Sequence, residues 1–319
     1  MLRICFAAIL FLISGTCFSQ NYIEYHKKFS AIEELIVNEQ FQRAEDSIIQ
    51  LFSLYDPPYL REVDIAIQIC ALNRSYENTA VLIELAFKKG AELASMKTKP
   101  VLQDFIKTTK WLELTENYPK YRKVHFNSID SVLRDNFRAR FEKEEVSRGT
   151  DSFAGIVENN FYHIVKIINL IGCFPGEKVV GVQQLGDYMF GDFGTGYYSY
   201  DNSKVTVTLL HYQLAFSSLE KELLRAVEQG NLHPYDYAMI YDFQKNYAQK
   251  KDYYRVKKNY VNFIRPSLPD YDFNVFYGYC DNFDKVNTDR ATIGLCTYQT
   301  EKQKTKIDEK YNLEIDQVY

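Results

Sequence analysis

The chain lacks two features that would assign it to common classes of protein. It has no apolar run long enough to cross a bilayer, since the longest one extends only from Ile4 to Ile13. It also has no basic excess, because 38 Lys and Arg stand against 42 Asp and Glu, for a formal net charge of −4. We therefore expect no nucleic-acid partner and no transmembrane segment in the mature chain.

Cysteines are sparse and irregularly spaced. Four follow residue 19, and no two of them have the C-x-x-C spacing of a zinc site, so we expect neither a metal nor a disulfide scaffold. Cys70 lies in an apolar helical stretch and reads as a buried thiol. Cys280 and Cys296 lie close together in a loop-rich region. They are the pair that we expect to bridge if the chain contains a disulfide.

The familiar catalytic motifs are absent as well. The sequence contains no H-E-x-x-H, no G-x-S-x-G, no phosphate-binding G-x-x-x-x-G-K and no EF-hand loop. The glycine-aromatic segment from Gly186 to Gly196 lacks the spacing of a dinucleotide-binding loop, so it reads as a turn. We therefore expect no cofactor, and the sequence favours a protein without catalytic activity.

The first nineteen residues have the pattern of a secretory signal peptide. Arg3 precedes the apolar run, and Cys17 and Ser19 occupy positions −3 and −1 of a cut before Gln20. This pattern predicts export to the periplasm or the exterior, with cleavage after Ser19. The alternatives are lipid anchoring at Cys17 and an uncleaved anchor. The lipid signal is disfavoured because Ser14 and Thr16 depart from the usual residues before such a cysteine.

Two segments of the N-terminal part resemble each other. NEQFQRAEDSIIQLF begins at Asn38, and NRSYENTAVLIELAF begins 35 residues later at Asn73. This period resembles that of tetratricopeptide helix-turn-helix repeats, although the characteristic Trp and Gly are missing. The segments predict two stacked α-hairpins over residues 22–95 that would bind a peptide or protein partner. Two ordinary antiparallel hairpins are the alternative.

Prolines divide the rest of the chain. Breaks are expected at Asp56-Pro57-Pro58, at Lys99-Pro100 and at Asn117-Tyr118-Pro119. They suggest a signal peptide (1–19), an α-hairpin domain (20–118) and a helical domain (119–319). Apolar periodicity and end signals predict further helices over residues 128–146, 152–171, 203–229 and 234–248. Residues 252–298 are expected to form an extended, tyrosine-rich stretch with a little β-structure. The tail, residues 300–319, is expected to be a polar helix or a frayed end.

One histidine and one aspartate suggest a catalytic alternative. His211 lies at the edge of the apolar stripe of its helix, and Asp242 lies on the following helix. If the two converge, the carboxylate would orient the imidazole as a general base, with Arg138 or Arg290 holding an anionic group. That arrangement would make the protein a hydrolase-like enzyme.

The second half of the chain contains a series of motifs in this order: RDNFR with Asp135 and Arg138, Asn159 or Asn160, GCFPGEKVVG, the helix of His211, YAMIYD with Ala238 and Asp242, and VNTDRATIGL with Asp289, Arg290, Gly294 and Leu295. This order resembles that of a bacterial family of exported domains of unknown function. The resemblance covers about residues 130–300 and implies a domain boundary and a set of candidate residues, but no reaction. Asn160, Arg138, Asp135, Asp289 and Arg290 are the binding candidates.

These observations combine into one expectation. The chain is predicted to be a mainly α exported protein, with tetratricopeptide-like hairpins followed by a helical domain that has a small irregular or β-containing C-terminal part. We expect a non-catalytic binding or interaction protein, with the hydrolase-like centre at His211 and Asp242 as the alternative.

Overall fold

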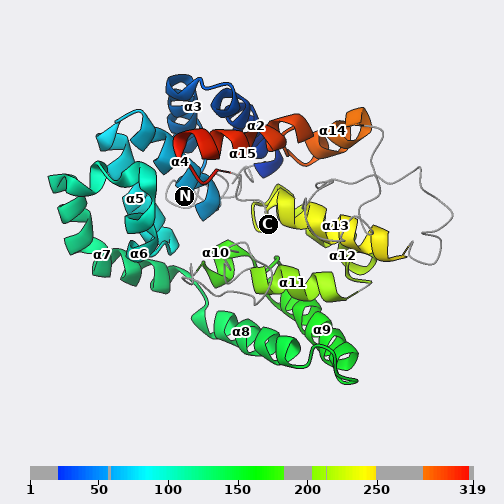
Figure 1. The fold of residues 1–319 in the computed structure, drawn as a ribbon. Coiled ribbons are helices and arrows are strands. Elements are labelled where there is room, and N and C mark those ends of the chain that lie inside the picture. The colour runs from blue at the N-terminus through cyan, green and yellow to red at the C-terminus, as the bar shows by residue number, and fades with distance from the viewer. Residues whose placement is uncertain (1–20, 57–58, 183–202, 213, 249–282, 316–319) are drawn as a thin grey trace, which may run out of the picture.

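The computed structural model describes residues 21–56, 59–182, 203–212, 214–248 and 283–315, and within these ranges the chain forms helices and no strand (Figure 1). The expectation of a mainly α fold is confirmed, whereas a β-containing C-terminal part is not seen in the described residues. The predicted signal peptide lies outside them. The helices are α2 (Tyr22–Val37), α3 (Phe41–Leu54), α4 (Leu60–Leu72), α5 (Tyr76–Lys89), α6 (Leu93–Thr98), α7 (Thr109–Ser128), α8 (Ser131–Val146), α9 (Phe153–Ile171), α10 (Glu177–Val180), α11 (Ser203–His211), α12 (Ala215–Glu228), α13 (Pro234–Ala248), α14 (Phe283–Thr292) and α15 (Tyr298–Tyr311), with short 3₁₀ turns at Pro100–Leu102 and Phe105–Lys107.

The repeated segments form two helical hairpins, α2–α3 and α4–α5, as the 35-residue offset predicts. The equivalent residues Ala44 and Thr79 are both fully buried. A buried carboxylate, Glu45, joins the hairpins because it accepts hydrogen bonds from Asn73 at 2.8 Å and from Asn78 at 2.8 Å. The hairpin turns therefore carry a polar contact in addition to apolar packing.

The predicted break at residues 117–119 is wrong, because α7 continues through Pro119. The proline removes one backbone hydrogen bond, which ordinarily favours a kink or an end. Here its neighbours hold the helix against α5, since the rings of Tyr118 and Tyr121 lie 4.9 Å and 6.3 Å from that of Phe87. Aromatic packing of this kind compensates for the lost bond.

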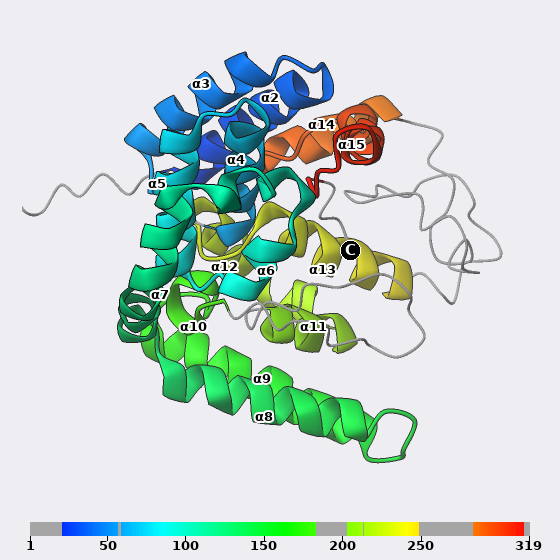
Figure 2. The same ribbon diagram turned by 60° about the vertical axis from the view of Figure 1, so that its left-hand side comes forward.

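A second apolar cluster is built by α8, α9 and α11–α13. It centres on fully buried side chains such as Leu209, Leu223 and Ala238. The amphipathic helix α9 ends at Gly172 with a φ of 75°, as its sequence predicts. The single helix expected over residues 203–229 is instead two helices, α11 and α12. This break lets α12 turn against α13, and Figures 1 and 2 show α8 and α9 as a paired hairpin at one end of the molecule.

The C-terminal helices return to the N-terminal hairpins. In Figures 1 and 2, α15 lies beside α2, and Ile307, Leu313 and Ile315 join the apolar cluster of the hairpins. The expected extended stretch contains the helix α14 in its described part. Of the two alternatives for the tail, the polar helix is confirmed by α15, in which Lys304 is only 2% exposed. Residues assigned from the sequence to a second domain therefore complete the core of the first.

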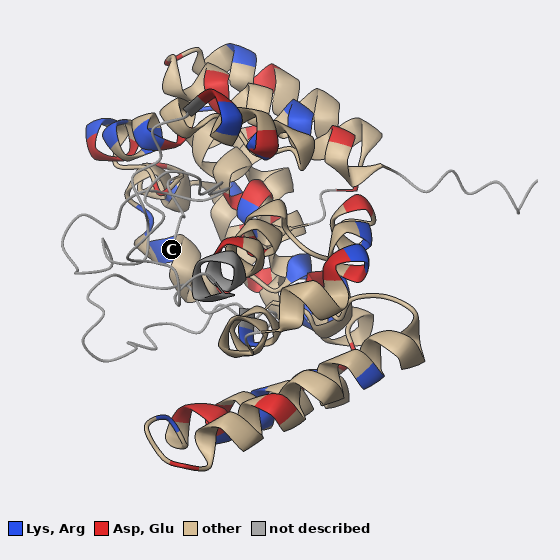
Figure 3. Ribbon diagram, turned by 90° about the vertical axis from the view of Figure 1, so that its right-hand side faces the viewer, with Lys and Arg blue, Asp and Glu red and all other residues tan. Residues whose placement is uncertain are grey.

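Charges of both signs alternate along the helices. In the view of Figure 3, acidic and basic segments lie next to each other on the same elements. Among the described residues, no helix is both long enough and apolar enough for a bilayer-spanning segment.

Candidate functional site

The described residues contain two buried clusters in which histidine meets glutamate. We call the first the Glu62 cluster, consisting of Tyr25, His26, Glu62 and His233. The second, the Glu144 cluster, consists of Glu144, Asn160, Thr208 and His211. A carboxylate that leaves water for a protein interior must be matched by donors or cations, so both clusters are expected to be structurally specific.

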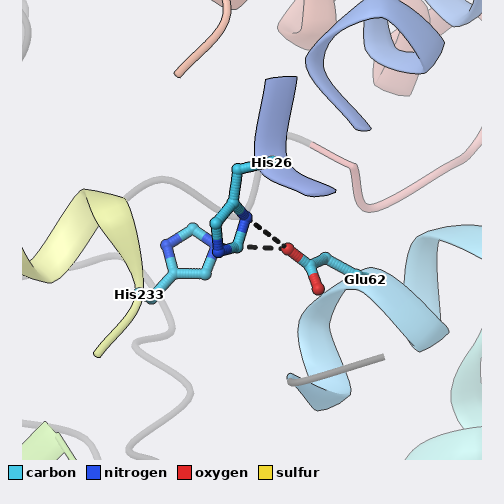
Figure 4. A group of neighbouring side chains, drawn as sticks. All are labelled: His26, Glu62 and His233. Carbon is cyan, nitrogen blue, oxygen red and sulfur yellow. Dashed lines mark ion pairs between the residues drawn. The ribbon is translucent and has the colours of Figure 1, made fainter. Parts of the chain in front are cut away.

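The Glu62 cluster joins three elements that are far apart in sequence. His26 comes from α2, Glu62 from α4 and His233 from the residue before α13, and Figure 4 shows both imidazole rings directed at one carboxylate oxygen. Nδ1 of His26 lies 3.2 Å from that oxygen and Nε2 of His233 lies 3.7 Å from it. The Tyr25 hydroxyl donates to the other oxygen at 2.9 Å. Burial would raise the pKa of Glu62, but the hydrogen bonds from His233 and His26 lower it to about 2.

The hydrogen bonds fix which nitrogen of the His233 ring carries the proton. The backbone N–H of Tyr235 donates to Nδ1 of His233 at 3.1 Å, so Nδ1 is an acceptor and Nε2 carries the proton facing Glu62. Burial keeps this imidazole neutral by lowering the pKa of His233 to about 4. Nδ1 of His26 faces Glu62, and its buried Nε2 has no hydrogen-bond partner among the described residues.

A metal ion at the Glu62 cluster conflicts with this pattern. Ligand atoms of His26, Glu62 and His233 lie within 4.8 Å of one another, a spacing that a cation could bridge. Coordination through Nε2 of His233 needs a lone pair there, and Nδ1 would then have to carry the proton. That proton would meet the N–H of Tyr235 and break the cap at the start of α13. The cluster therefore fits a hydrogen-bonded centre better than a metal centre.

A small pocket opens beside the Glu62 cluster. It lies between α2, α4, the start of α13 and the segment that joins α14 to α15. Gly294, in that segment, has a φ of 86°, and a Cβ there would lie 2.5 Å from the Cβ of His26, so glycine is what lets the segment approach α2. The lining residues are His26, Phe29, Ser30, Glu33, Arg61, Glu62, His233, Pro234, Tyr235, Gly294, Leu295, Cys296, Glu301 and Lys304.

One wall of the pocket is a chain of ion pairs. Nζ of Lys304 lies 2.6 Å from Glu33 and 3.4 Å from Glu301, and Nη2 of Arg290 lies 3.1 Å from Glu301. Burial would raise the pKa of Glu301, but Lys304 and Arg290 lower it to about 2. This wall is therefore ionised at neutral pH. By contrast, burial raises the pKa of Tyr235 and keeps its hydroxyl protonated.

The Glu144 cluster lies in the second apolar cluster. Nδ1 of His211 lies 2.5 Å from one oxygen of Glu144, and the other oxygen accepts from Asn160 at 2.7 Å and from Thr208 at 3.3 Å. The carboxylate therefore orients the imidazole and leaves Nε2 as the acceptor. Nη2 of the exposed Arg148 already lies 3.0 Å from Nε2. This ring is oriented like a general base, but its accepting nitrogen is engaged.

The structure brings some predicted residues together and separates others. His211 and Asn160 meet, but they do so at Glu144, while Asp242 is buried on α13. Arg290 belongs to the other site, where it contacts Glu301. The remaining candidates lie near the surface or outside these contacts: Asp135 is exposed and pairs with Arg134, Asp289 pairs with Lys285, and Arg138 is half-buried on α8.

The predicted bridge between Cys280 and Cys296 is not seen. Cys296 carries a free, buried thiol whose Sγ lies 3.2 Å from Glu301, and Cys280 lies outside the described residues. The thiol is held in the ion-pair wall, and burial raises its pKa. Cys70 is a buried free thiol, as expected.

The sequence analysis missed six residues of the two clusters: Tyr25, His26, Glu62, His233, Glu144 and Thr208. For two of these residues, Glu144 and Glu62, the sequence contains a recognisable signal. Glu144 follows Phe137 and Phe141 at helical spacing, which places it on the buried face of α8. Glu62 lies in a helix whose other residues are almost all buried. A charge in either position requires a partner.

Comparison of the chain with family models, with curated proteins and with solved structures finds no match. Its function is therefore argued from its own residues.

Proposed function

We propose that this protein is a non-catalytic binding protein that holds a small molecule in the pocket beside the Glu62 cluster. One observation carries the proposal. Three residues lining the pocket each have a buried polar atom without a hydrogen-bond partner among the described residues: Nε2 of His26, the hydroxyl of Tyr235 and Oε1 of Glu301. Each such atom costs about 1–3 kcal/mol unless something binds it. A small molecule or an ordered water that reached these atoms would satisfy them.

The nucleophile-type side chains in the pocket favour binding over catalysis. The Ser30 hydroxyl donates to the backbone carbonyl of Gly294 at 2.6 Å, so its proton is committed to the fold. The Cys296 thiol has a pKa well above its ordinary value because of burial, and a thiol is a much weaker nucleophile than a thiolate. Neither group is arranged for covalent attack.

The test is a search for a ligand on the purified mature protein. Native mass spectrometry would reveal a co-purified molecule, and thermal denaturation would be followed with panels of sugars, amino acids and nucleosides. We expect a saturable rise in melting temperature with at least one compound, and a smaller rise in Tyr235→Phe, which removes one of the three atoms. A pocket that holds only water in a crystal structure, with no stabilising compound, would contradict the proposal.

A hydrolase-like activity at His211 is the second candidate, and the orientation of this imidazole by Glu144 favours it. Arg148 would have to leave Nε2 before a substrate could be deprotonated there. Hydrolysis of p-nitrophenyl esters and phosphates by wild type would be compared with that by His211→Gln. The control is His163→Gln, a half-buried histidine on α9. A rate that is absent in wild type, or equal in the three proteins, would eliminate this candidate.

We also propose export with removal of residues 1–19. The support is the order of Arg3, the apolar run and the small residues before Gln20. The mature protein is expected in the periplasm or the medium, with a mass that corresponds to a start at Gln20. A cytoplasmic protein of full length, or one that begins with a lipid-modified Cys17, would contradict this route.

A further inference from the structure

We propose that helix α4 and the turn at Lys99 form a binding site for a peptide segment with the pattern apolar–Glu–apolar. The chain fills this site with its own residues Leu313, Glu314 and Ile315, which follow α15. The partner is a protein that presents the same pattern in an extended segment. None of the residues that form the site lines the pocket beside the Glu62 cluster, so the inference stands apart from the proposed small-molecule function.

The side-chain amide of Gln68, on α4, holds the backbone of the segment. Its Oε1 accepts the N–H of Glu314 at 2.7 Å, and its Nε2 donates to the carbonyl of the same residue at 3.3 Å. The amide thus uses both hydrogen-bonding groups of the main chain at one position and requires no particular side chain there. Main-chain contacts of this kind supply affinity in peptide sites, while pockets for alternate side chains supply specificity.

The side chains of the segment supply that specificity. Leu313 and Ile315 are 5% and 2% exposed and join the apolar cluster of the hairpins, whereas Glu314 between them is half-buried. This alternation is typical of an extended segment that lies on a surface. Oε2 of Glu314 lies 2.5 Å from Nζ of Lys99, which is itself buried, so the charge contact is weakly screened. The site therefore selects an acidic residue between two apolar ones.

The receptor side of this contact is held in place by its own residues. Asp64, one helical turn before Gln68, accepts from Nε2 of that residue at 3.0 Å and lies 3.0 Å from Nζ of Lys99. Removal of the segment would leave the lysine with a carboxylate and the amide with an acceptor. A site that keeps its geometry when empty loses less free energy to ordering when it binds. This arrangement favours a binding site over a core that forms only around the segment.

The segment can leave the site while α15 stays in position. Ion pairs of Lys304 with α2 and of Lys310 with the turn after α2 anchor that helix independently of the segment. Asn312 ends α15 in the left-handed conformation, with a φ of 53°, and Asp308 accepts the N–H of Ile315 at 2.9 Å. Residue 312 is therefore the joint between an anchored helix and the bound segment. A partner that displaced the segment would expose the site without dismantling the hairpins.

The test is fluorescence polarisation with a labelled peptide of residues 308–315, capped at both ends. In wild type the tethered segment competes at an effective concentration on the order of millimolar, so the free peptide should bind weakly. Leu313→Asp combined with Ile315→Asp places carboxylates where apolar side chains are buried and should empty the site. This double variant should bind the peptide at least tenfold more tightly than wild type does. A peptide with lysine in place of Glu314 should bind it at least tenfold more weakly.

Two further substitutions in the double variant separate recognition from general stability. Gln68→Met removes both main-chain contacts and should weaken binding of the peptide at least tenfold. Gln42→Met is the matched control, because Gln42 also donates to an aspartate four residues away at 3.0 Å, but at an exposed position on α3. It should leave binding of the peptide unchanged.

A second variant decides the question if circular dichroism shows that the double variant is unfolded. Glu314→Lys changes one half-buried side chain and opposes it to Lys99, so it should also bind the peptide at least tenfold more tightly than wild type does. Folded variants that bind no better than wild type, or binding that Gln68→Met leaves unchanged, would overturn the proposal. Loss of folding in both variants would overturn it as well, because the segment would then be part of the core.

Discussion

Lys304 and Glu33 form an ion pair inside the protein, with 2.6 Å between Nζ and Oε1, although 271 residues separate them in the chain. The pair attaches α15 to α2 and forms part of the pocket wall. Burial lowers the pKa of Lys304, but the carboxylates of Glu301 and Glu33 raise it above its ordinary value, so the lysine is charged. The last helix is therefore held by a charge contact as well as by apolar packing.

Replacement of this lysine should be severely destabilising. Lys304→Met leaves Glu33 and Glu301 as buried carboxylates that have lost a cation, and removal of one partner of a buried pair costs about 3–5 kcal/mol. The matched control is Lys310→Met, since Lys310 of α15 pairs at the surface with Glu39, in the turn that follows α2. Urea denaturation would measure both. Equal losses of stability in the two variants would contradict the importance of burial at this contact.

Glu177 should make stability fall as pH rises. Its carboxyl is buried and accepts the N–H of Leu60 at 2.7 Å, and burial raises its pKa from 4.5 to about 8. Because the folded pKa is above the unfolded one, its contribution is fully present below pH 4.5 and is lost as pH rises to about 8. The loss is on the order of 5 kcal/mol. Glu177→Gln retains an acceptor oxygen, and its denaturation midpoint should vary less with pH between pH 5 and 8 than that of wild type. An equal dependence on pH in the two proteins would contradict this assignment.

The Glu62 cluster should have the opposite effect: it should make the protein less stable as pH falls. The folded pKa of Glu62 is lowered to about 2 and that of His233 to about 4, both below their ordinary values. Their contributions are therefore present above the unfolded pKa values and are lost as pH falls, from about 6.5 for His233 and about 4.5 for Glu62. Glu62→Gln should be less stable than wild type at pH 7, and the difference should shrink by pH 3. A difference that is constant with pH would argue against an ionised Glu62.

Replacement of Gly294 tests whether the segment between α14 and α15 must pack closely against α2. Gly294→Ala introduces a Cβ 2.5 Å from that of His26, in addition to the strain of a positive φ. Gly149→Ala has a similar φ of 82° but meets no atom within 4 Å, so it should show only the strain, about 1–2 kcal/mol. Thermal unfolding should show a clearly larger loss for Gly294→Ala. Equal losses of stability in the two variants would mean that the segment can shift away from α2 without cost.

Local features of the fold could be predicted from the sequence. Periodicity and end signals placed α9 up to Gly172 and α13 from Pro234, because both depend on residues within a few turns. The break between α11 and α12 was not predicted, since the apolar stripe continues across it. The continuation of α7 through Pro119 was not predicted either, because it depends on rings packed from α5. Tertiary packing overrides the local preference in both cases.

The site was harder to predict because its partners are distant in sequence. His211 was identified, but the choice of Asp242 over Glu144 as its carboxylate required a distance that no sequence pattern supplies. The Glu62 cluster joins residues from three elements, and none of its members belongs to a known spacing. Binding of a peptide by the α-hairpins stays a prediction.

The contact between α15 and α2 has a consequence for how the chain matures. The helix α2, near the start of the chain, packs against α15, near its end, so the N-terminal hairpins have no finished core while synthesis is under way. Contacts of such sequence separation slow folding, because a long loop must close before they form. A nascent chain shorter than residue 298 would expose Glu33 and lack one wall of the pocket. Acquisition of the native state is thereby deferred until translation ends.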